Sequence, residues 1–484
     1  MRRVTEAKRL IIRPDAGSAF EETCDVLIAG SGSAGVCAAL EAAEAGASVV
    51  VLERLEQAGG SSALSSGQVY LGGGTALQQA CGFDDSADAL FQYLVATCGP
   101  GADEEKTRIF ADRATEHYEW LLAHDVPFKP TFLPHTETTN PPGDDGLTYT
   151  GSELSYPICG IAAPAPRGHN VQHEGSSGVR LMSGLLSEAA KLGIEIRTQC
   201  AVESLIQSDS REIVGALARS EAGKAQWIRA RRGVVLTTGG FHHDLEMLRR
   251  YAPTLVPLLP IGVTSEDGSG IRLGMAAGGD VMGMEAGCII LPYTKPRKLV
   301  KGILVNAYGQ RFINEDLYQA VHGDVAVHAQ AGHVFCIADA EVFGEPMMDI
   351  PIIGPCDTIE ELEGKLELPT GSLVQTWQTY NENAARGQDP VFHKSREWLE
   401  PLDRAPYRAL DLRISSFPYP FFTLGGLRTT PEGQVLNSES EAIPGLFAAG
   451  RSTSGICARG YSSGVSLADA TFFGRLAGRS AAAR

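Results

Sequence analysis

A glycine-rich motif near the start of the chain has the residue types and spacing of a dinucleotide-binding turn. The segment 30–35 (GSGSAG) follows one apolar run and precedes an alanine-rich helix and a second apolar run. Gly30 permits a tight turn, Gly32 lets backbone N–H groups approach a pyrophosphate, and Gly35 lets helix and strand pack closely. Glu53 follows the second run, where its carboxylate suits ribose hydroxyls. The motif therefore predicts dinucleotide binding.

Two later segments have a similar character. The apolar run 234–240 ends in Thr-Gly-Gly, which lets the backbone pass close to a cofactor, and the segment 443–450 (IPGLFAAG) also ends in glycine. We expect 30–35 and 443–450 to form two sides of one cofactor site.

The elements that must position these motifs follow from the hydrophobic pattern. After a strand–helix–strand unit over 24–53, the stretch 127–176 has no periodicity and is expected to form long ordered loops. Three short alternating runs predict an antiparallel β-meander over 201–206, 213–218 and 225–230. Further strands are predicted at 194–197, 234–240, 302–305 and 333–337, and helices at 86–98, 104–124, 179–192, 358–365, 371–386 and 466–482.

Composition and charge exclude several classes of protein. A length of 484 residues predicts two domains, and a net charge of −17 argues against nucleic acid, because phosphate contacts need clustered Lys and Arg. The ten cysteines and eleven histidines lack metal-ligand spacing, so we expect reduced thiols and no metal. No apolar stretch is long enough to span a membrane, and we expect a cytoplasmic protein. His169 and His173 could bind substrate, but we expect them at the surface.

Several segments, in order along nearly the whole chain, resemble the fumarate reductase/succinate dehydrogenase flavoprotein superfamily. They are 30–35 with Glu53, 59–62 (GGSS), 238–240 (TGG), 267–270 (DGSG), 305–315 (VNAYGQRFINE), 424–427 (LGGL) and 445–450. The resemblance implies an α/β fold with bound FAD and a substrate cleft between two domains. One is a discontinuous, Rossmann-like FAD-binding domain over 1–288 and 416–484, with a parallel sheet and a β-meander. The other is an inserted α+β capping and catalytic domain over 289–415.

The resemblance also implies which residues hold FAD. Arg451 replaces the acidic residue that often follows the closing glycine in this superfamily, and it could pair with a phosphate directly. No histidine lies between 59 and 74, so we expect FAD to be bound non-covalently. The cofactor-binding residues implied are Gly30, Ser31, Gly32, Ser33, Ala34, Gly35, Glu53, Arg54, Gly60, Ser61, Ser62, Val202, Thr238, Gly239, Gly240, Asp267, Gly425, Gly450, Arg451, Gly464, Ser466 and Leu467.

Two segments point to a substrate class within the superfamily. The segments 70–75 (YLGGGT) and 458–475 resemble the 3-ketosteroid Δ4-(5α)-dehydrogenase branch. Fumarate reductases carry a histidine and a cationic or amide pair in the corresponding loop, whereas this chain has no histidine after His393. The resemblance implies an oxidoreductase that introduces, or reduces, the Δ4 double bond of a 3-ketosteroid and passes electrons to an external acceptor.

This chemistry makes three demands on the protein. A proton leaves the carbon next to the ketone, a hydride passes from the neighbouring carbon to flavin N5, and the developing enolate oxygen must be stabilised. The resemblance pairs two tyrosines and a serine for these tasks. Tyr461 is the candidate donor to the enolate oxygen, Ser463 the candidate proton acceptor, and Tyr318 the link to solvent. The roles can be exchanged, with a tyrosine as the base.

Two other functions remain open at this point. One is a fumarate-reductase-like reductase of another activated alkene, such as an unsaturated carboxylate, with Arg459 as the acid. Arg459 could equally support the structure. The other is a flavin-binding electron-transfer subunit, although the sequence has no iron–sulfur or haem motif of its own. Ser462, Ser463 and Ser466 could also simply cap the last helix.

Overall fold

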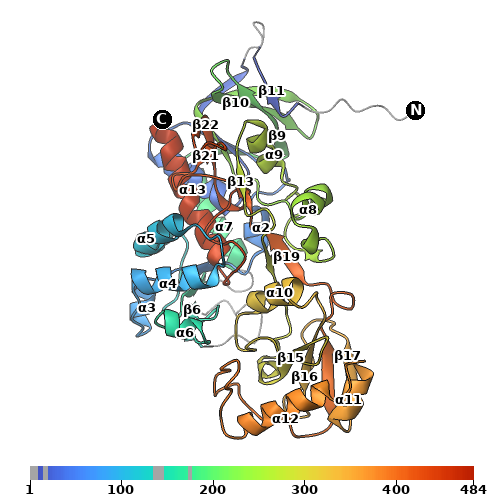
Figure 1. Ribbon diagram of the computed structural model, residues 1–484. Coiled ribbons are helices and arrows are strands. Elements are labelled where there is room, and N and C mark those ends of the chain that lie inside the picture. Colours follow the sequence, from blue (N-terminus) through green and yellow to red (C-terminus); the bar gives the residue numbers. More distant parts are fainter. Residues whose placement is uncertain (1–8, 15–19, 135–145, 173–176) are drawn as a thin grey trace, which may run out of the picture.

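The largest sheet of the computed structural model, which describes residues 9–14, 20–134, 146–172 and 177–484, has nine strands (Figure 1). The central strands are parallel, whereas the meander strands pair antiparallel at one side. Along the sheet the order is β1 (Ile11–Ile12), β9 (Cys200–Gln207), β10 (Ile213–Ser220), β11 (Ala225–Leu236), β2 (Glu22–Ala29), β3 (Val49–Leu52) and β8 (Glu195–Arg197). In addition, β22 (Ala442–Ala448) pairs with β11 and with β21 (Gln434–Leu436). The predicted α/β class is confirmed.

Strand β11 differs from the prediction of two separate strands. It runs without a break from Ala225 to Leu236, and its register against β2 shifts between Ala230 and Gly233. The first half pairs antiparallel with β10, and the second half pairs parallel with β22. One strand therefore belongs to both the meander and the parallel sheet.

Helices α1 (Ser33–Glu44) and α13 (Val465–Ala483) pack closely on this sheet. A Cβ atom at Gly474 would lie 2.4 Å from the carbonyl oxygen of Ala34, and one at Gly478 would lie 2.0 Å from that of Ala38. Only glycine fits such contacts. Ala34 lies against Gly474 and Ala38 against Gly478, so the residue numbers rise in the same direction along both helices. The helices are therefore parallel, and their N-termini point the same way. The N-terminus of α13 extends about 12 Å beyond that of α1, at about 1.5 Å per residue.

The stretch predicted as loops contains short regular elements. Strands β4 (Gln68–Tyr70), β7 (Gly168–Asn170), β6 (Leu147–Thr148) and β5 (Phe132–Leu133) form a four-stranded sheet, and α6 (Ile158–Ile161) lies between β6 and β7. The surface position expected for His169 is wrong, because β7 places this side chain in the core, where its Nε2 lies 2.8 Å from Thr75 Oγ1. His173 is outside the described residues.

A second sheet lies at the opposite end of the molecule from the meander (Figure 1). It is antiparallel, in the order β15 (Ile303–Asn306), β16 (Val334–Ala338), β18 (Tyr407–Asp411) and β17 (Ile352–Cys356), and α11 (Ile359–Lys365) packs against it. Between the two large sheets lies a small one made of β12 (Leu259–Pro260), β19 (Pro420–Thr423) and β14 (Gly287–Ile289), with α10 (Gln319–His328) against β14. The proposed boundaries at 289 and 415 remain a prediction.

The remaining elements surround these sheets. Among the helices of the described residues, none has the length and apolar character needed to cross a membrane. The elements are α2 (Gly60–Leu64), α3 (Ala76–Ala80), α4 (Ala87–Thr97), α5 (Glu104–Ala123), α7 (Ser177–Lys191), α8 (Leu245–Tyr251), α9 (Ser269–Ala276), α12 (Ser372–Ala384), β13 (Val281–Met282) and β20 (Gly426–Leu427).

Candidate active site

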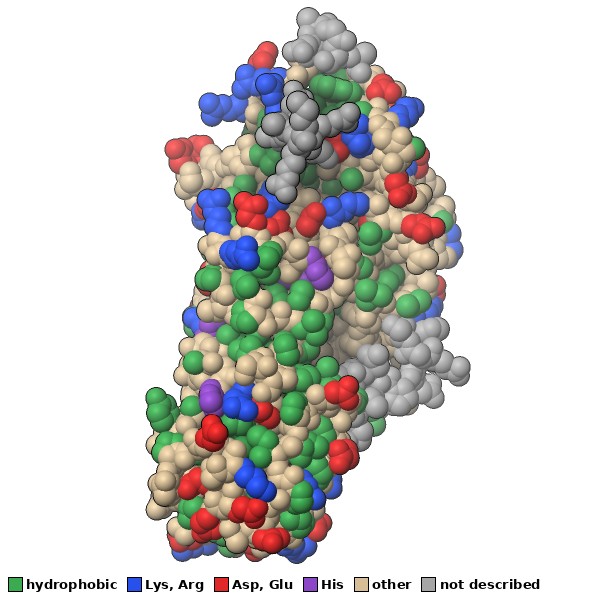
Figure 2. Space-filling view, turned by 90° about the vertical axis from the view of Figure 1, so that its right-hand side faces the viewer, with side chains coloured by type: hydrophobic (Ala, Val, Ile, Leu, Met, Phe, Trp, Pro, Cys, Tyr) green, Lys and Arg blue, Asp and Glu red, His purple; other side chains and the backbone are tan. Residues whose placement is uncertain are grey.

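A cavity of about 670 Å³ extends from the carboxyl ends of β2, β3 and β11 to the segments that lead into the second sheet. A volume of this size is typical of cofactor and ligand sites. The face of the molecule in Figure 2 shows hydrophobic side chains gathered over its middle, with charged side chains denser towards both ends. The cavity has two chemically different ends.

The glycines of the 30–35 motif take different parts at the first end. Gly30 has φ +106°, and a Cβ atom there would lie 2.4 Å from the carbonyl oxygen of Thr237, so the turn needs glycine. At Gly32, by contrast, the nearest atom to an added Cβ is Ser62 Oγ at 3.6 Å, and at Gly60 it is Gly32 Cα at 3.9 Å. Gly32 and Gly60 are therefore close neighbours on the cavity wall, and their missing side chains leave a hollow there that a ligand can enter.

Two helix N-termini open into the cavity. Helix α1 begins after Gly32 and α13 begins after Gly464, and neither has a side-chain cap or an acidic residue in its first turn. Ser33 N already bonds to Ser62 Oγ at 3.1 Å and Ser466 N to Tyr461 Oη at 3.2 Å, so the helix dipoles and the remaining first-turn N–H groups favour negative charge. With the hollow at Gly32, this arrangement suits the pyrophosphate of a dinucleotide at α1 and an electron-rich ring edge at α13.

Glu53 lies where a ribose acceptor is expected. It is buried at the end of β3, and its carboxylate accepts hydrogen bonds from Ser31 N at 3.0 Å and Ser31 Oγ at 2.6 Å. Next to it, Arg54 pairs with Asp267 at 2.8 Å. Val202, from β9, lines the same part of the cavity.

Arg451 makes a contact that the sequence did not reveal. Its Nη2 lies 2.5 Å from Glu266 Oε1, and its guanidinium lies 5.0 Å from the centre of the Phe422 ring. Glu266 also accepts a hydrogen bond from Gly240 N at 3.1 Å. Arg451 is therefore already paired with a protein carboxylate.

Most of the predicted cofactor residues line the cavity, but four lie behind its wall. A Cβ added at Gly35 would lie 2.0 Å from the Gly30 oxygen, and one added at Gly240 would lie 2.4 Å from Thr423 Oγ1. One added at Gly425 would lie 2.1 Å from the Gly283 oxygen. These three glycines permit close packing. The fourth residue, Asp267, reaches the wall through its ion pair with Arg54. The predicted residues on the wall are Gly30, Ser31, Gly32, Ser33, Ala34, Glu53, Arg54, Gly60, Ser61, Ser62, Val202, Thr238, Gly239, Gly450, Arg451, Gly464, Ser466 and Leu467.

The three predicted catalytic side chains meet at the other end of the cavity. Tyr318 precedes α10, whereas Tyr461 and Ser463 precede α13, and all three line the wall. The Tyr461 hydroxyl accepts a hydrogen bond from Ser466 N at 3.2 Å, and Phe422 meets its ring edge-on at a centroid distance of 5.4 Å. The Tyr461 hydroxyl proton therefore remains available to a ligand.

Burial controls the ionisation of these groups. It raises the pKa of Tyr461 well above its usual value, and the nearby Cys288 and Tyr318 add to the effect. Burial also raises the pKa of Tyr318, although a hydrogen bond with Ser463 opposes this in part. Both phenols are therefore neutral at pH 7.

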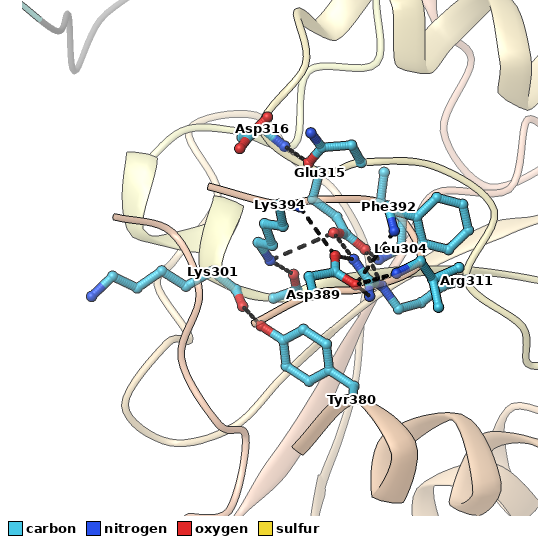
Figure 3. Close-up of polar contacts among 12 residues, drawn as sticks. Lys301, Leu304, Arg311, Glu315, Asp316, Tyr380, Asp389, Phe392 and Lys394 are labelled. Carbon is cyan, nitrogen blue, oxygen red and sulfur yellow. Dashed lines mark hydrogen bonds and ion pairs between the residues drawn. The ribbon is translucent and has the colours of Figure 1, made fainter. Parts of the chain in front are cut away.

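Buried ion pairs hold the segment that leads to Tyr318. Arg311 lies 2.6 Å from Glu315 and 2.9 Å from Asp389, and Lys394 lies 3.6 Å from Glu315. Figure 3 shows these side chains pointing towards one another. Because removing one partner would leave a buried charge unpaired, the cluster fixes this segment strongly.

An apolar wall completes this end, and sequence reasoning missed it. Its members come from separate short segments and share no motif. They are Cys288, Ile290, Pro292, Met347, Met348, Pro420 and Phe422. Arg459, in contrast, is exposed and does not line the cavity. Glu266 was missed as well, and only its position before the 267–270 motif could have drawn attention to it.

The comparisons with known proteins agree with this geometry. The profile of the FAD binding domain family matches residues 25–466. A crystal structure of 3-ketosteroid Δ4-(5α)-dehydrogenase from Rhodococcus jostii RHA1, in complex with 4-androstene-3,17-dione, has a TM-score of 0.92 and 43% identity, covering 97% of this chain and 100% of that one. The match confirms the predicted cofactor, FAD, and the predicted superfamily.

Curated relatives include two kinds of enzyme. The 3-oxo-5-alpha-steroid 4-dehydrogenase of Comamonas testosteroni is 30% identical in an alignment of 424 residues that covers 73% of this chain and 78% of the relative. NADH:acrylate oxidoreductase of Vibrio harveyi is 31% identical in an alignment of 298 residues that covers 56% of this chain. The match spans only 29% of the Vibrio harveyi relative's length.

Proposed function

This chain belongs to the FAD binding domain family, and from that premise we propose that it is an FAD-dependent 3-oxosteroid 4-dehydrogenase. It introduces or reduces the Δ4 double bond of a 3-ketosteroid, and it exchanges electrons with an external acceptor. The observation that carries the proposal is the meeting of Tyr318, Tyr461 and Ser463 at an apolar end of the cofactor cavity. The likeness to the Rhodococcus jostii enzyme supports the same substrate class.

The cofactor end provides the FAD site. The α1 N-terminus and the hollow at Gly32 and Gly60 would hold the pyrophosphate, Glu53 would accept a hydrogen bond from a ribose, and the α13 N-terminus would hold the flavin ring. When bound, FAD supplies the acceptor for the hydride. In the proposed domain division, residues 289–415 form the capping domain that covers this site.

The ketone end activates the substrate. Tyr461 donates its hydroxyl proton in a hydrogen bond to the ketone oxygen, and this bond strengthens as negative charge develops on that oxygen. A neutral phenol suits this task because it brings no charge into an apolar cavity. The wall at Ile290, Pro292 and Met348 excludes water and packs against the hydrocarbon rings.

Ser463 and Tyr318 move the proton. Ser463 takes the proton from the carbon next to the ketone as it passes its own proton to the Tyr318 hydroxyl, which is near enough for Ser463 to lower the pKa of Tyr318. Tyr318 is half-buried and releases a proton towards solvent. A serine is a weak base, so the onward transfer of its proton to Tyr318 is essential to the step.

An unsaturated carboxylate is the competing substrate class, and the likeness to the acrylate oxidoreductase favours it. The cavity does not support it. Within the described residues the only Lys or Arg side chains on the wall are Arg54 and Arg451, and both are paired with carboxylates. Arg459, the alternative acid, is off the wall.

Anaerobic mixing of the FAD-loaded protein with 5α-androstane-3,17-dione tests the proposal. We expect the flavin absorption band to bleach and the product to carry the Δ4 double bond. A protein that keeps FAD, is not bleached by 3-ketosteroids, and when reduced is reoxidised by acrylate or fumarate would contradict it.

A further inference from the structure

The three proposed catalytic groups come from two distant parts of the chain, yet one buried turn contacts both parts. The turn is Thr150–Glu153, which we call the 150–153 turn. Ser152 Oγ accepts a hydrogen bond from Tyr318 N at 3.0 Å, and Thr150 Oγ1 donates one to the Ser463 carbonyl oxygen at 3.2 Å. The turn therefore touches the backbone on both sides of the ketone end.

Tyr93, from α4, joins the turn to the loop that carries Tyr461 and Ser463. Its hydroxyl lies 2.8 Å from Ser462 Oγ and accepts a hydrogen bond from Ser152 N at 2.9 Å. Gly151 packs so closely here that an added Cβ would lie 2.0 Å from Tyr93 Oη and 2.7 Å from Ser462 Oγ. One hydroxyl thus ties the turn to the loop.

Tyr93 and the turn are themselves held firmly. Tyr93 is fully buried, its ring stacks on that of Tyr70 at 5.5 Å, and the buried guanidinium of Arg167 lies 5.2 Å from the ring centre. Glu153 is buried as well, and it accepts hydrogen bonds from Gly151 N at 2.8 Å and from the Tyr70 hydroxyl at 3.1 Å. The fixed partners leave the turn little freedom.

We propose that the 150–153 turn and Tyr93 act as a clamp that sets the position of Tyr318 relative to Tyr461 and Ser463, with Ser152 and Tyr93 as positioning residues. The inference rests on the proposed roles of those three groups. Neither Ser152 nor Tyr93 lines the cavity, so each acts through backbone and side-chain neighbours only. Proton transfer is sensitive to small displacements, and a shift of about 1 Å can cost roughly 100-fold in rate.

The test compares Tyr93→Phe and Ser152→Ala with wild type. Tyr93→Phe keeps the ring stacking and removes only the hydroxyl. We expect kcat for a 5α-3-ketosteroid to fall roughly tenfold to 100-fold in each variant. KM should change by less than about threefold and FAD content should be unchanged, because neither side chain contacts the cavity.

Amide hydrogen exchange gives a second readout that needs no steroid. The clamp predicts faster exchange at Tyr318 and over 460–464 in Tyr93→Phe, and at Tyr318 in Ser152→Ala. The double variant Tyr93→Phe with Ser462→Ala should lose no more activity than Tyr93→Phe alone, because both changes break the same contact. Thr107→Val is the matched control, since the Thr107 hydroxyl is also buried but bonds to the carbonyl of Asp103, the N-cap residue of its own helix.

The outcomes separate the clamp from the proposed function. Reduced kcat with unchanged KM and faster exchange at both places supports the clamp. Unchanged kcat, or exchange no faster than in Thr107→Val, overturns it. If the wild type fails to oxidise 3-ketosteroids while the exchange effects occur, the contacts of the clamp are supported and the proposed function is contradicted.

Discussion

The pyrophosphate end of the cavity is built mainly from backbone of one contiguous segment, whereas the ketone end is built from side chains of many separate segments. At the first end, Gly30, Gly32 and the α1 N-terminus lie within five residues of one another. At the second end, Tyr318 and Tyr461 come from distant parts of the chain, and the 150–153 turn contacts the segments that carry both. A backbone site depends on local conformation, and a side-chain site depends on tertiary packing.

This difference predicts two different kinds of failure. Changes at the pyrophosphate end should remove FAD and with it all activity, while the protein still folds. Changes at the ketone end should leave FAD bound and slow the reaction.

The largest effect is expected from Gly32→Asp. Gly32 has φ −66°, which any residue adopts, and the hollow has room for a side chain, so the fold should be kept. The new carboxylate would face the pyrophosphate, and like charges in contact cost several kcal/mol. FAD affinity should fall by more than about 100-fold. Flavin absorbance per chain and a fluorescence titration with FAD measure this.

Gly160→Asp is the control for added charge. Gly160 is exposed, has no atom within 4 Å of an added Cβ, and is not on the cavity wall. A Gly32→Asp protein that is purified with a full complement of FAD would show that the hollow does not hold the pyrophosphate.

Tyr461→Phe should have the next largest effect. It removes the hydroxyl that we propose donates to the ketone oxygen and keeps the ring against Phe422. The rate of flavin reduction should fall on the order of 100-fold while FAD stays bound. Stopped-flow absorbance under anaerobic conditions measures the rate.

Tyr380→Phe provides the matched comparison. Its hydroxyl donates to the Lys301 carbonyl oxygen at 3.3 Å, outside the cavity. This change should cost about 1 kcal/mol of stability and leave flavin reduction unaltered. Equal rates in Tyr461→Phe and wild type would remove Tyr461 from the proposed mechanism.

The same difference explains how far the sequence could predict the site. Gly30, Gly32 and Glu53 carry a local motif, and their placement follows from a strand–turn–helix–strand pattern that needs no tertiary knowledge. Cys288, Ile290 and Met347 carry no such signal. They reach the cavity only because separate segments fold together, and no spacing in the chain reveals that.

Parts of the fold were unpredictable for a similar reason. The strands β5, β6 and β7 have two or three residues each, too few to show a period of two, so the region was interpreted as loops. In β11 the pattern changes where the strand passes from the meander to the parallel sheet, which suggested two strands. Long helices such as α5 and α13 were predicted to within a few residues.

A smaller effect is expected from Met347→Ala at the apolar wall. Met347 lines the cavity yet is about half exposed, so its truncation should not disturb the core. Losing part of its contact with the hydrocarbon rings should weaken substrate binding by about 1 kcal/mol. This corresponds to about a fivefold increase in KM, with kcat unchanged. Met282→Ala is the control, because Met282 is also exposed but lies off the wall. An unchanged KM in Met347→Ala would mean that the substrate contacts only the more deeply buried residues of the apolar wall.

The smallest effect on the rate is expected from a change of pH. The pH dependence distinguishes Ser463 from a tyrosine as the base. Burial raises the pKa of both Tyr461 and Tyr318, so each phenol stays neutral from pH 7 to 9 and neither should impose a titration on the rate. With Ser463 as the proton acceptor, flavin reduction should therefore change by less than about threefold across this range. A rate that instead rises about tenfold per pH unit would mean that the reactive form is a phenolate, whose fraction grows tenfold per unit below its pKa. That result would assign the base to a tyrosine, and the variant that abolishes the slope, Tyr318→Phe or Tyr461→Phe, would identify which one.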